Sequence, residues 1–374
     1  MITMKRKYIS FCIGAIALSV SGSASSQSSI TITGLIDAGV TYVNNQRGGS
    51  KTFLDTGSFA PNLLTFKGTE DLGGGNRAIF ELTSQFDLGT GATNPTADGI
   101  FNRTSYVGLS NNRIGSVTFG NQYDFMYETL TLGFFDGALL AGGIYDFRQG
   151  PFVALGVPGN PTGSFDFDRM GGTTRVANSV KYRSPGNSAL QFGVLYGFGG
   201  VPGAFSANST LSFGVSYANG PLALGAAFVN VKYTGLFDGL DGSIRNFGFG
   251  AHYRFGSMLA MLLYTNTANT ASGGRINVYK TGAQWDVGGP WAVGLHYTFM
   301  DGNAMLDNNR ANQVSGVVQY HLSKRTFVYV EGIYQHASGD APVTHAWINA
   351  LNQPGGASTS GTQVLARVGL STRF

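Results

Sequence analysis

The sequence predicts an all-β protein, a transmembrane barrel of sixteen antiparallel strands, and three observations support this prediction. Charged residues make up only 12 % of the 374-residue chain, about half the share of roughly 25 % that is usual in globular domains. Beyond the N-terminus, the sequence has no apolar run of the length that a membrane helix needs. Apolar and polar residues alternate instead, which is typical of strands that face lipid on one side and water on the other.

The N-terminal segment has the three parts of a secretory signal. A basic cluster at 5–7 precedes an apolar run over 9–20, and small residues follow at 24–26. A membrane anchor is the alternative, but the run falls short of the roughly 20 residues that cross a bilayer. We therefore expect a cleaved signal peptide over residues 1–26 and a barrel over residues 27–374.

Removal of this signal changes what the charge and cysteine counts imply. The chain has 24 Lys and Arg, and without the three in the signal 21 remain against 20 Asp and Glu, so the mature chain is close to neutral. Such a balance does not favour a nucleic-acid partner. The chain's one cysteine, Cys12, lies in the signal, which excludes disulfides and thiolate metal sites from the barrel.

Period-two alternation marks the expected strands. From Arg175 to Arg183, basic and small side chains share one face, and Val176, Val180 and Tyr182 lie on the other. Sixteen such segments lie in order at 30–43, 60–70, 76–87, 101–110, 113–122, 175–183, 188–198, 208–218, 221–233, 244–255, 257–268, 275–287, 290–301, 311–322, 325–337 and 361–374. Their lengths suit tilted membrane strands, for which roughly 9–11 residues suffice.

The connections between these segments alternate between long and short. The short ones are rich in Gly, Asn, Asp and Ser, which tolerate the left-handed backbone of tight turns. They lie at 71–75, 111–112, 184–187, 219–220, 256, 288–289 and 323–324, and the long ones include 44–59, 88–100 and 123–174. One rim of tight turns and one of long loops is typical of outer-membrane barrels. An even number of strands lets the first and last strands pair, which leaves no open edge in lipid.

Aromatic residues recur near the ends of the expected strands, for example Tyr42, Tyr182, Tyr253 and Tyr297. Rings with an apolar body and a polar tip favour the membrane interface. A core stripe of a soluble β-sandwich is the alternative, and the two unequal rims of connections disfavour it.

Four segments, taken in order, carry a family resemblance. They are the first strand from Ser29 to Val40, the turn segment from Phe66 to Gly75, the segment from Phe101 to Leu109, and the segment from Asn178 to Tyr182. They are similar to the general porins of Gram-negative bacteria, in particular the trimeric β-proteobacterial type. The terminal Phe374, which follows alternating apolar positions, resembles the signal by which such chains are assembled into the outer membrane.

The resemblance implies a sixteen-stranded barrel in outer-membrane lipid, usually a homotrimer, whose third long loop folds into the lumen and narrows it. Here that loop is 123–174, the longest connection. A structureless loop of this length would argue against a compact domain, but inside a barrel it has a wall to pack on. The family often carries an arginine three to four residues before the position of Lys67, where this chain has Leu63 and Leu64, and another near Asn121. We therefore expect fewer bases on the basic side of the constriction.

A channel needs charge at its narrowest point, because rings of fixed charge select ions. Acids on the long loop that could contribute are Asp124, Glu128, Asp136 and Asp146, with Asp166 and Asp168 beside Arg148 and Arg169. Bases that the alternation turns into the lumen are Lys67, Arg77, Arg103, Arg175, Lys181 and Arg183. Arg103 and Arg175 are the strongest candidates, because both lie in the loop-side half of their strands. The alternative for each residue is that it solvates the lumen or pairs with a neighbour, as we expect of Glu81 beside Arg77.

The sequence and the resemblance together predict an outer-membrane channel for passive diffusion of ions and small hydrophilic solutes, with a weak preference for anions from the wall arginines. No cofactor or metal is expected, since the five histidines form no metal-spaced motif. The run Gly73–Gly75 lacks the Lys-Ser or Lys-Thr of a phosphate-binding loop and is expected to form a turn. We expect no enzyme, because a barrel hydrolase would need a nucleophile grouped with a base.

Two other functions on the same fold remain alternatives. A substrate-specific channel would carry a track of lumenal aromatics for sugars or a ladder of bases for phosphate, whereas the predicted lumen mixes Arg, Gln, Thr, Ser and Asp. An adhesive barrel would carry larger loops than these, apart from 123–174.

Overall fold

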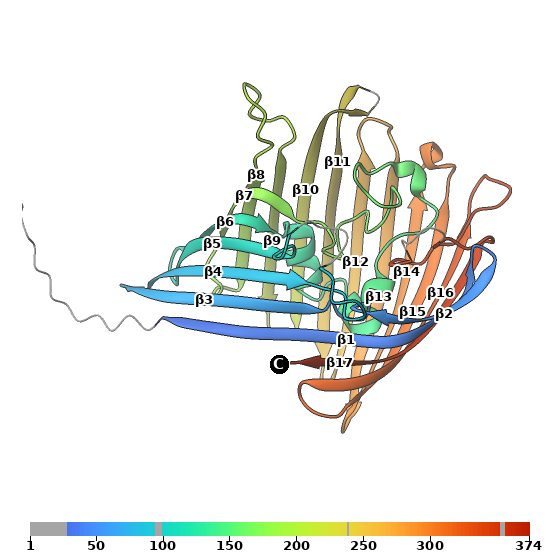
Figure 1. Cartoon of the computed structure of the whole chain (residues 1–374), viewed down its shortest axis with the longest axis horizontal. Helices are drawn as coiled ribbons and strands as arrows, with labels where there is room; N and C mark the ends of the chain where they lie inside the picture. The colour runs from blue at the N-terminus through green and yellow to red at the C-terminus, as the bar shows by residue number, and fades with distance from the viewer. Residues whose placement is uncertain (1–27, 94–98, 238, 352–355) are drawn as a thin grey trace, which may run out of the picture.

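The strands of the computed structural model form one antiparallel sheet that closes into a barrel (Figure 1). The structure describes residues 28–93, 99–237, 239–351 and 356–374, so the expected signal over 1–26 lies outside the described residues. The strands are β1 (Ser29–Gln46), β2 (Gly49–Thr56), β3 (Leu63–Gly73), β4 (Asn76–Gln85), β5 (Thr104–Asn111), β6 (Gly115–Gln122), β7 (Val176–Arg183), β8 (Leu190–Gly197), β9 (Thr210–Asn219), β10 (Leu222–Phe237), β11 (Leu240–Phe255), β12 (Met258–Asn269), β13 (Arg275–Gly288), β14 (Trp291–Gly302), β15 (Arg310–His321), β16 (Thr326–Ser338) and β17 (Thr362–Arg373).

The barrel closes where the two ends of the chain meet. Strands β1 and β17 pair from Leu35 with Arg373 to Val43 with Leu365. Phe374 continues this seam, because its backbone exchanges two hydrogen bonds with Gly34, both of 3.0 Å. Pairing around the whole ring leaves no open sheet edge among the described strands.

The seventeen strand segments of the described residues occupy sixteen positions around the barrel. Both β2 and β3 pair with β1 on the same side of it, β3 with its first half and β2 with its second half. They therefore act as one interrupted strand, and the predicted barrel of sixteen strands is confirmed.

The expected long connection over 44–59 was wrong. Strand β1 continues to Gln46, and β2 follows a tight turn in which Arg47 and Gly48 have φ values of 54° and 91°. The interruption comes later, between β2 and β3, where Asn62 Oδ1 accepts a 2.7 Å hydrogen bond from the Asp37 backbone N–H. Glycines and Pro61 give this region the composition of a loop, because proline has no N–H to donate to the hydrogen bonds between strands.

Side chains alternate between the two faces of the wall. On β16, Val330 is 56 % exposed, whereas the next residue, Glu331, is 2 % exposed. The exposed apolar side chains cover the outer face of the barrel, and polar and charged side chains line the inner face. Among the described residues, no helix is long and apolar enough to cross a membrane.

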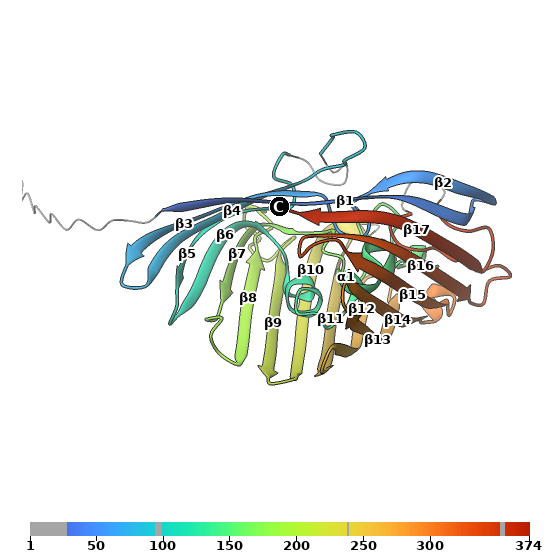
Figure 2. The same ribbon diagram turned by 90° about the horizontal axis from the view of Figure 1, so that it is seen from below.

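The connection between β6 and β7 folds into the barrel, as expected for the loop 123–174. It contains a π-helix η1 (Met126–Thr131), α1 (Ala138–Ala141) and two 3₁₀-helices, η2 (Gly143–Asp146) and η3 (Val153–Leu155). Figure 2 shows these turns inside the ring of strands. A further 3₁₀-helix, η4 (Ala304–Leu306), lies between β14 and β15.

Apolar contacts hold this loop against the inner wall. Leu130 belongs to a buried cluster with Val229 of β10, and Phe152 belongs to another with Ile276 of β13. All four side chains are completely buried. Burial of such a side chain contributes about 1.5–3 kcal/mol, so the loop has a well-defined position in the lumen.

Candidate functional site

A cavity of about 200 Å³ lies where the loop faces the wall formed by β2 to β5. Its wall side carries Arg103, Arg175, Gln85 and Asp55, and its loop side is largely apolar. The apolar residues of the loop side are Leu139, Ile144, Phe147 and Phe165. The two arginines that the sequence ranked first thus lie at one cavity, together with an acid that the sequence analysis did not name.

Arg103 is held by neutral groups. Its Nη1 donates a 2.6 Å hydrogen bond to Gln85 Oε1. The guanidinium carbon lies 5.3 Å from the ring centre of Tyr123 and 6.0 Å from that of Tyr127, in cation–π contact. The side chain lies just before β5 and is 5 % exposed.

Arg175 is also held by neutral groups, and it is the last loop residue before β7. Its Nη2 donates to the Asn102 carbonyl oxygen at 2.6 Å, and its Nη1 donates to the Thr173 carbonyl oxygen at 2.8 Å. Burial and the nearby charge of Arg103 lower the pKa of the Arg175 guanidinium from its ordinary value. Two like charges that share a cavity without a carboxylate partner make this side of the lumen electropositive.

Asp55 supplies the carboxylate at the cavity, and it belongs to a network on the wall. Its Oδ2 accepts a 2.6 Å bond from Arg367 Nη1 of β17, and the hydroxyl of Tyr145 on the loop also donates to it. Arg367 Nη2 in turn donates to Asp37 Oδ1 at 2.8 Å, and Arg367 Nε lies 3.9 Å from Glu331 Oε1. The alternation of the last strand places Arg367 on the inner face, and this signal could have identified it.

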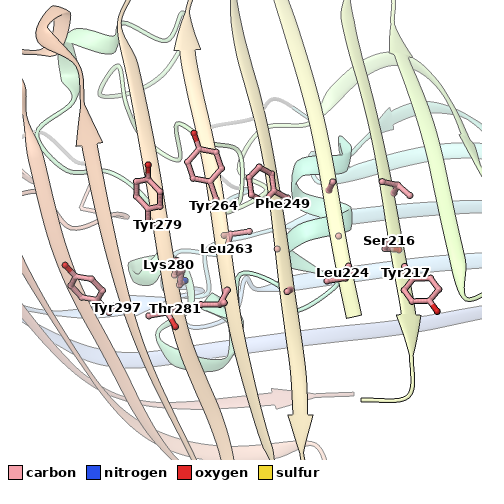
Figure 3. Close-up of a pocket in the computed structure, with 16 residues that line it drawn as sticks. Ser216, Tyr217, Leu224, Phe249, Leu263, Tyr264, Tyr279, Lys280, Thr281 and Tyr297 are labelled. Atoms are coloured by element: carbon pink, nitrogen blue, oxygen red, sulfur yellow. The ribbon is translucent and has the colours of Figure 1, made fainter. Parts of the chain in front are cut away.

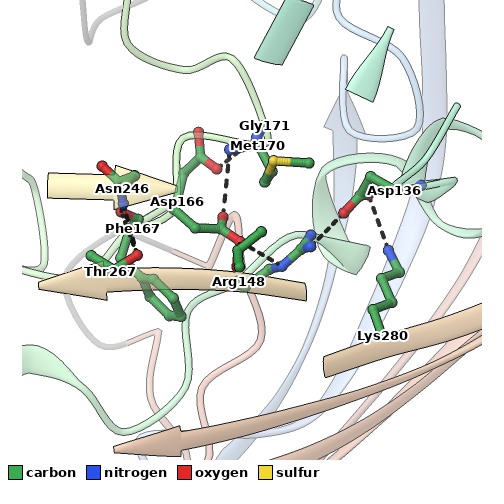
Figure 4. Close-up of polar contacts among 12 residues, drawn as sticks. Asp136, Arg148, Asp166, Phe167, Met170, Gly171, Asn246, Thr267 and Lys280 are labelled. Atoms are coloured by element: carbon green, nitrogen blue, oxygen red, sulfur yellow. Dashed lines mark hydrogen bonds and ion pairs between the residues drawn. The ribbon is translucent and has the colours of Figure 1, made fainter. Parts of the chain in front are cut away.

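Three of the loop acids lie in a buried chain of ion pairs that joins the loop to the wall, and Figure 4 shows the part of this chain from Arg148 through Asp136 to Lys280. Asp136 pairs with Arg148 and with Lys280 of β13, and Arg148 Nε lies 3.0 Å from Asp168 Oδ2. Lys280 Nζ lies 2.6 Å from Asp146 Oδ2. The side chains of all five residues are at most 1 % exposed.

The chain of ion pairs ends at a histidine on the wall. Asp146 Oδ2 lies 3.0 Å from His296 Nδ1 of β14. Burial alone would raise the pKa of Asp146, but the charge of Lys280 and the hydrogen bond with His296 hold it well below its usual range. Lys280 and His296 were absent from the predicted site, although the alternation of their strands turns both of them inward.

Two further loop acids, Asp124 and Glu128, are also paired, whereas Asp166 accepts hydrogen bonds from Gly171 and Thr173 and forms no ion pair with a described residue. Asp124 Oδ2 lies 2.6 Å from Arg169 Nε within the loop. Glu128 lies between two predicted wall bases of β7, with its Oε2 2.6 Å from Lys181 Nζ and its Oε1 in an ion pair with Arg183. Lys181 is 1 % exposed, so its charge is neutralised away from open water.

Four of the six predicted wall bases do not line the cavity, namely Lys181 and Arg183, which pair with Glu128, and Lys67 and Arg77. Lys67 Nζ forms a 3.0 Å ion pair with Glu81 Oε2, and its side chain is 57 % exposed. Arg77 Nη1 donates to Asn112 Oδ1 at 3.0 Å beside the tight turns. The expected partner of Glu81 was therefore wrong, because the register places Lys67 directly opposite Glu81 and Arg77 opposite Asp71. Among the described residues, no group of His, Cys, Asp and Glu could hold a metal ion.

Comparisons with known proteins agree with this architecture. A family model described as Gram-negative porin matches residues 14–340. The outer membrane porin protein 32 of Delftia acidovorans is 32 % identical over 336 residues, which cover 87 % of this chain and 88 % of that one. An outer membrane porin protein of Bordetella pertussis is 26 % identical over 378 residues, which cover 86 % of this chain and 92 % of that one.

Solved structures give the same result. The structure titled an anion-selective porin from Comamonas acidovorans is 27 % identical in sequence and superposes with a TM-score of 0.76, covering 93 % of this chain and all of that one. The family match and these relatives agree with the closed barrel, the inward loop and the charged cavity of the structure. The chain therefore belongs to the Gram-negative porins, outer-membrane channels that act by passive diffusion of ions and small hydrophilic solutes and are not enzymes.

Proposed function

We propose that this porin prefers small anions and that Arg103 and Arg175 set the preference. The observation that carries this proposal is that both guanidinium groups bind neutral groups, whereas Asp55, the acid at the same cavity, is matched by Arg367. The 27 % identity to a structure titled an anion-selective porin supports the same preference. A solute that passes the cavity meets an excess of positive charge.

In this proposal the loop acids shape the constriction rather than supply free charge. Asp124, Glu128, Asp136 and Asp146 each have a basic partner. The pairs of Glu128, Asp136 and Asp146 fix the loop against the wall, and the pair of Asp124 with Arg169 lies within the loop. The wall bases outside the cavity have other roles, which depend on where each of them lies. Lys181 fixes Glu128, Lys67 is balanced by Glu81, and the half-buried Arg77 adds positive charge beside the tight turns. The charge at the cavity is therefore one-sided, with Arg103 and Arg175 opposite an apolar face of the loop and Asp55 at the same cavity.

Three further features belong to the proposal. The chain is exported by a signal peptide over residues 1–26, Phe374 at the barrel seam takes part in outer-membrane assembly, and the protein assembles as a homotrimer. The composition of the N-terminal segment supports the first feature. The two backbone hydrogen bonds between Phe374 and Gly34 support the second. Resemblance to trimeric porins supports the third.

Planar-bilayer recording of the refolded mature protein in a KCl gradient tests the preference. We expect a reversal potential of the sign that chloride permeation gives. In water, one unit charge at about 4 Å contributes about 1 kcal/mol, so each of Arg103→Gln and Arg175→Gln should lower the ratio of chloride to potassium permeability roughly fivefold. Arg113→Gln, at the exposed turn between β5 and β6, is the matched control. A double variant that keeps the parent's reversal potential would exclude these arginines as the determinant.

A further inference from the structure

The outer face of the barrel carries a groove of about 720 Å³ across β9 to β14 (Figure 3). Large apolar and aromatic side chains surround it, and they are between 39 and 61 % exposed. These side chains, which define the outer groove, are Tyr217, Leu224, Phe249, Leu262, Tyr279 and Tyr297. Inward-facing neighbours such as Leu263 and Lys280 are 5 % and 3 % exposed, so the groove opens away from the lumen.

The register of the strands explains the hollow. Leu224, Ala251, Leu262 and Thr281 lie in one row across four strands, and the next row places Ala226 opposite Phe249. Small side chains at 226, 251 and 281 leave space between the large ones. The hollow runs along the wall, and its shape suits an extended apolar chain.

Three basic side chains lie on the same outer face, toward the rim of long loops. Arg245 and Arg275 both pair with Ala268 of β12, one from each side, and Lys232 pairs with Ser243, two residues beyond Arg245. All three are exposed, and their inward neighbours Ile244 and Ile276 are buried. We call Lys232, Arg245 and Arg275 the basic trio.

The basic trio has unmatched charge. None of its three side chains forms an ion pair with a described residue, and the nearby Asp301 is paired with Arg310 at 2.9 Å. The carboxylate of Asp241, beyond Ser243, accepts a 3.0 Å bond from the Gly235 N–H. The three exposed cations are therefore available to bind an anionic group at this edge of the outer face.

The spacing of the two features matches half a bilayer. Arg245 lies four residues along β11 from Phe249 and six from Ala251. At a rise of about 3.4 Å per residue this places the trio roughly 14–20 Å along the strand from the groove. Half of a hydrocarbon core that is about 30 Å thick is about 15 Å, so cations at the headgroup level would lie above acyl chains in the groove.

We propose that the outer groove and the basic trio together bind one phosphorylated lipid of the outer leaflet, with its phosphate on Lys232, Arg245 and Arg275 and an acyl chain in the groove. Arginine presents a planar fork of donors that matches phosphate oxygens. Clusters of basic residues at a membrane surface recognise anionic headgroups. A free phosphate would not use the groove. A second copy of this chain on this face would have to supply acidic side chains opposite the basic trio, whereas a lipid phosphate supplies the negative charge directly.

Native mass spectrometry of the refolded porin in detergent tests this proposal, with titration of purified bis-phosphorylated lipid A, the same lipid without its phosphates, and inorganic phosphate. The triple variant Lys232→Gln, Arg245→Gln, Arg275→Gln should bind the phosphorylated lipid roughly 100-fold more weakly, because each basic residue at a membrane surface contributes about fivefold. The control Arg113→Gln, Lys324→Gln removes exposed charges at the tight turns and should bind as the parent does.

A second variant tests the groove. Ala251→Trp fills its centre from the outside and should weaken binding of the lipid with and without phosphate by similar factors. Bilayer conductance and the heat-modifiable shift of the barrel establish that each variant is folded. Parent-like binding of the phosphorylated lipid by the triple variant would overturn the proposal, as would equal affinity of the parent for the two lipids. Binding of inorganic phosphate as strong as that of the lipid would show an ion site without a lipid, and loss of the oligomer in the variants would assign this face to a subunit interface.

Discussion

Lys280 of β13 lies 2.6 Å from Asp146 of the inward loop, and the side chains of both residues are 1 % exposed. The same ammonium group lies 3.1 Å from Asp136, so one wall cation holds two acids that lie ten positions apart in the loop. Buried ions without a partner are costly, because the interior cannot solvate them. This lysine therefore fixes the side of the loop that faces away from the cavity.

Lys280→Met tests this role. The change leaves Asp146 with His296 and Asp136 with Arg148, and each acid loses part of its compensation. Removal of one partner from a buried pair costs about 3–5 kcal/mol. We expect a lower temperature for loss of the heat-modifiable barrel and noisier single-channel openings, measured by gel shift and bilayer recording.

The combination of Lys280→Met with Asp146→Asn provides the control. Asp136 keeps Arg148 in this double variant, and the neutral amide side chain introduced at position 146 no longer needs a cation. We expect most of the lost stability to return. If the double variant is less stable than Lys280→Met alone, the ion pair does not explain the effect of the lysine.

The second prediction concerns pH and Asp166. Burial and the nearby charge of Asp168 raise the pKa of Asp166 to about 6, although the Gly171 N–H donates to its Oδ1 at 2.6 Å. The unfolded value is roughly 4. The folded state therefore binds the proton more tightly, so the stabilisation from this group is present below about pH 4 and is lost as the pH rises to about 6. The amount is roughly 3 kcal/mol from two pKa units.

Asp166→Asn isolates this contribution. The asparagine cannot ionise, so the variant should lack this loss of stability between about pH 4 and pH 6. Thermal unfolding of the refolded barrel at several pH values, taken as the difference between parent and variant, cancels the other titrating groups. A difference that stays constant over this range would contradict the assignment to Asp166.

The alternation of side chains made most of the barrel predictable. It reports directly which face of a strand meets water, and Arg103 and Arg175 emerged as candidates because both lie near the loop end of their strands. The strand β2 was missed for a local reason. Gly57 and Pro61 have the composition of a loop, although they only interrupt a strand between two paired segments.

The partners of the loop acids could not be predicted from the sequence. Asp136 and Lys280 are 144 positions apart, and only the path of the loop across the lumen brings them together. That path depends on apolar contacts such as Phe152 against Ile276, whose sequence pattern has no regular period. The inward position of Arg367 could have been predicted, since its strand alternates clearly. Its partners could not, because they lie on three other strands.

The third prediction concerns the contact of the loop with the interrupted strand. Ile144 N–H donates to the Ser58 carbonyl oxygen at 2.7 Å, and Gly143 has a φ of 54°. A Cβ at position 143 would lie 2.2 Å from the Phe59 carbonyl oxygen, so Gly143→Ala must push the loop away from the wall. We expect a less stable barrel and an altered conductance, measured by gel shift and bilayer recording.

Gly159→Ala is the matched control for this change. Gly159 has a φ of 68°, but nothing lies within 4 Å of a Cβ there. It should therefore cost only the backbone strain of about 1–2 kcal/mol and leave the conductance unchanged. Equal effects of the two variants on conductance would show that the close approach at Gly143 does not position the loop.

The fourth prediction concerns Asp55, the acid at the cavity. Asp55→Asn removes one negative charge beside Arg103 and Arg175 but keeps an oxygen for Arg367 Nη1, which still has Asp37 as a partner. The anion preference should therefore increase. The increase should be larger at about 0.1 M salt, where the Debye length is about 10 Å, than at about 1 M, where it is about 3 Å. Reversal potentials in KCl gradients at both concentrations measure the change, with Asp301→Asn, a half-buried acid of the outer wall that pairs with Arg310, as the control. A shift toward cations, or an equal shift in the control, would mean that Asp55 does not act on the permeating ions, and the positive excess at the cavity would then have to be assigned to the arginines alone.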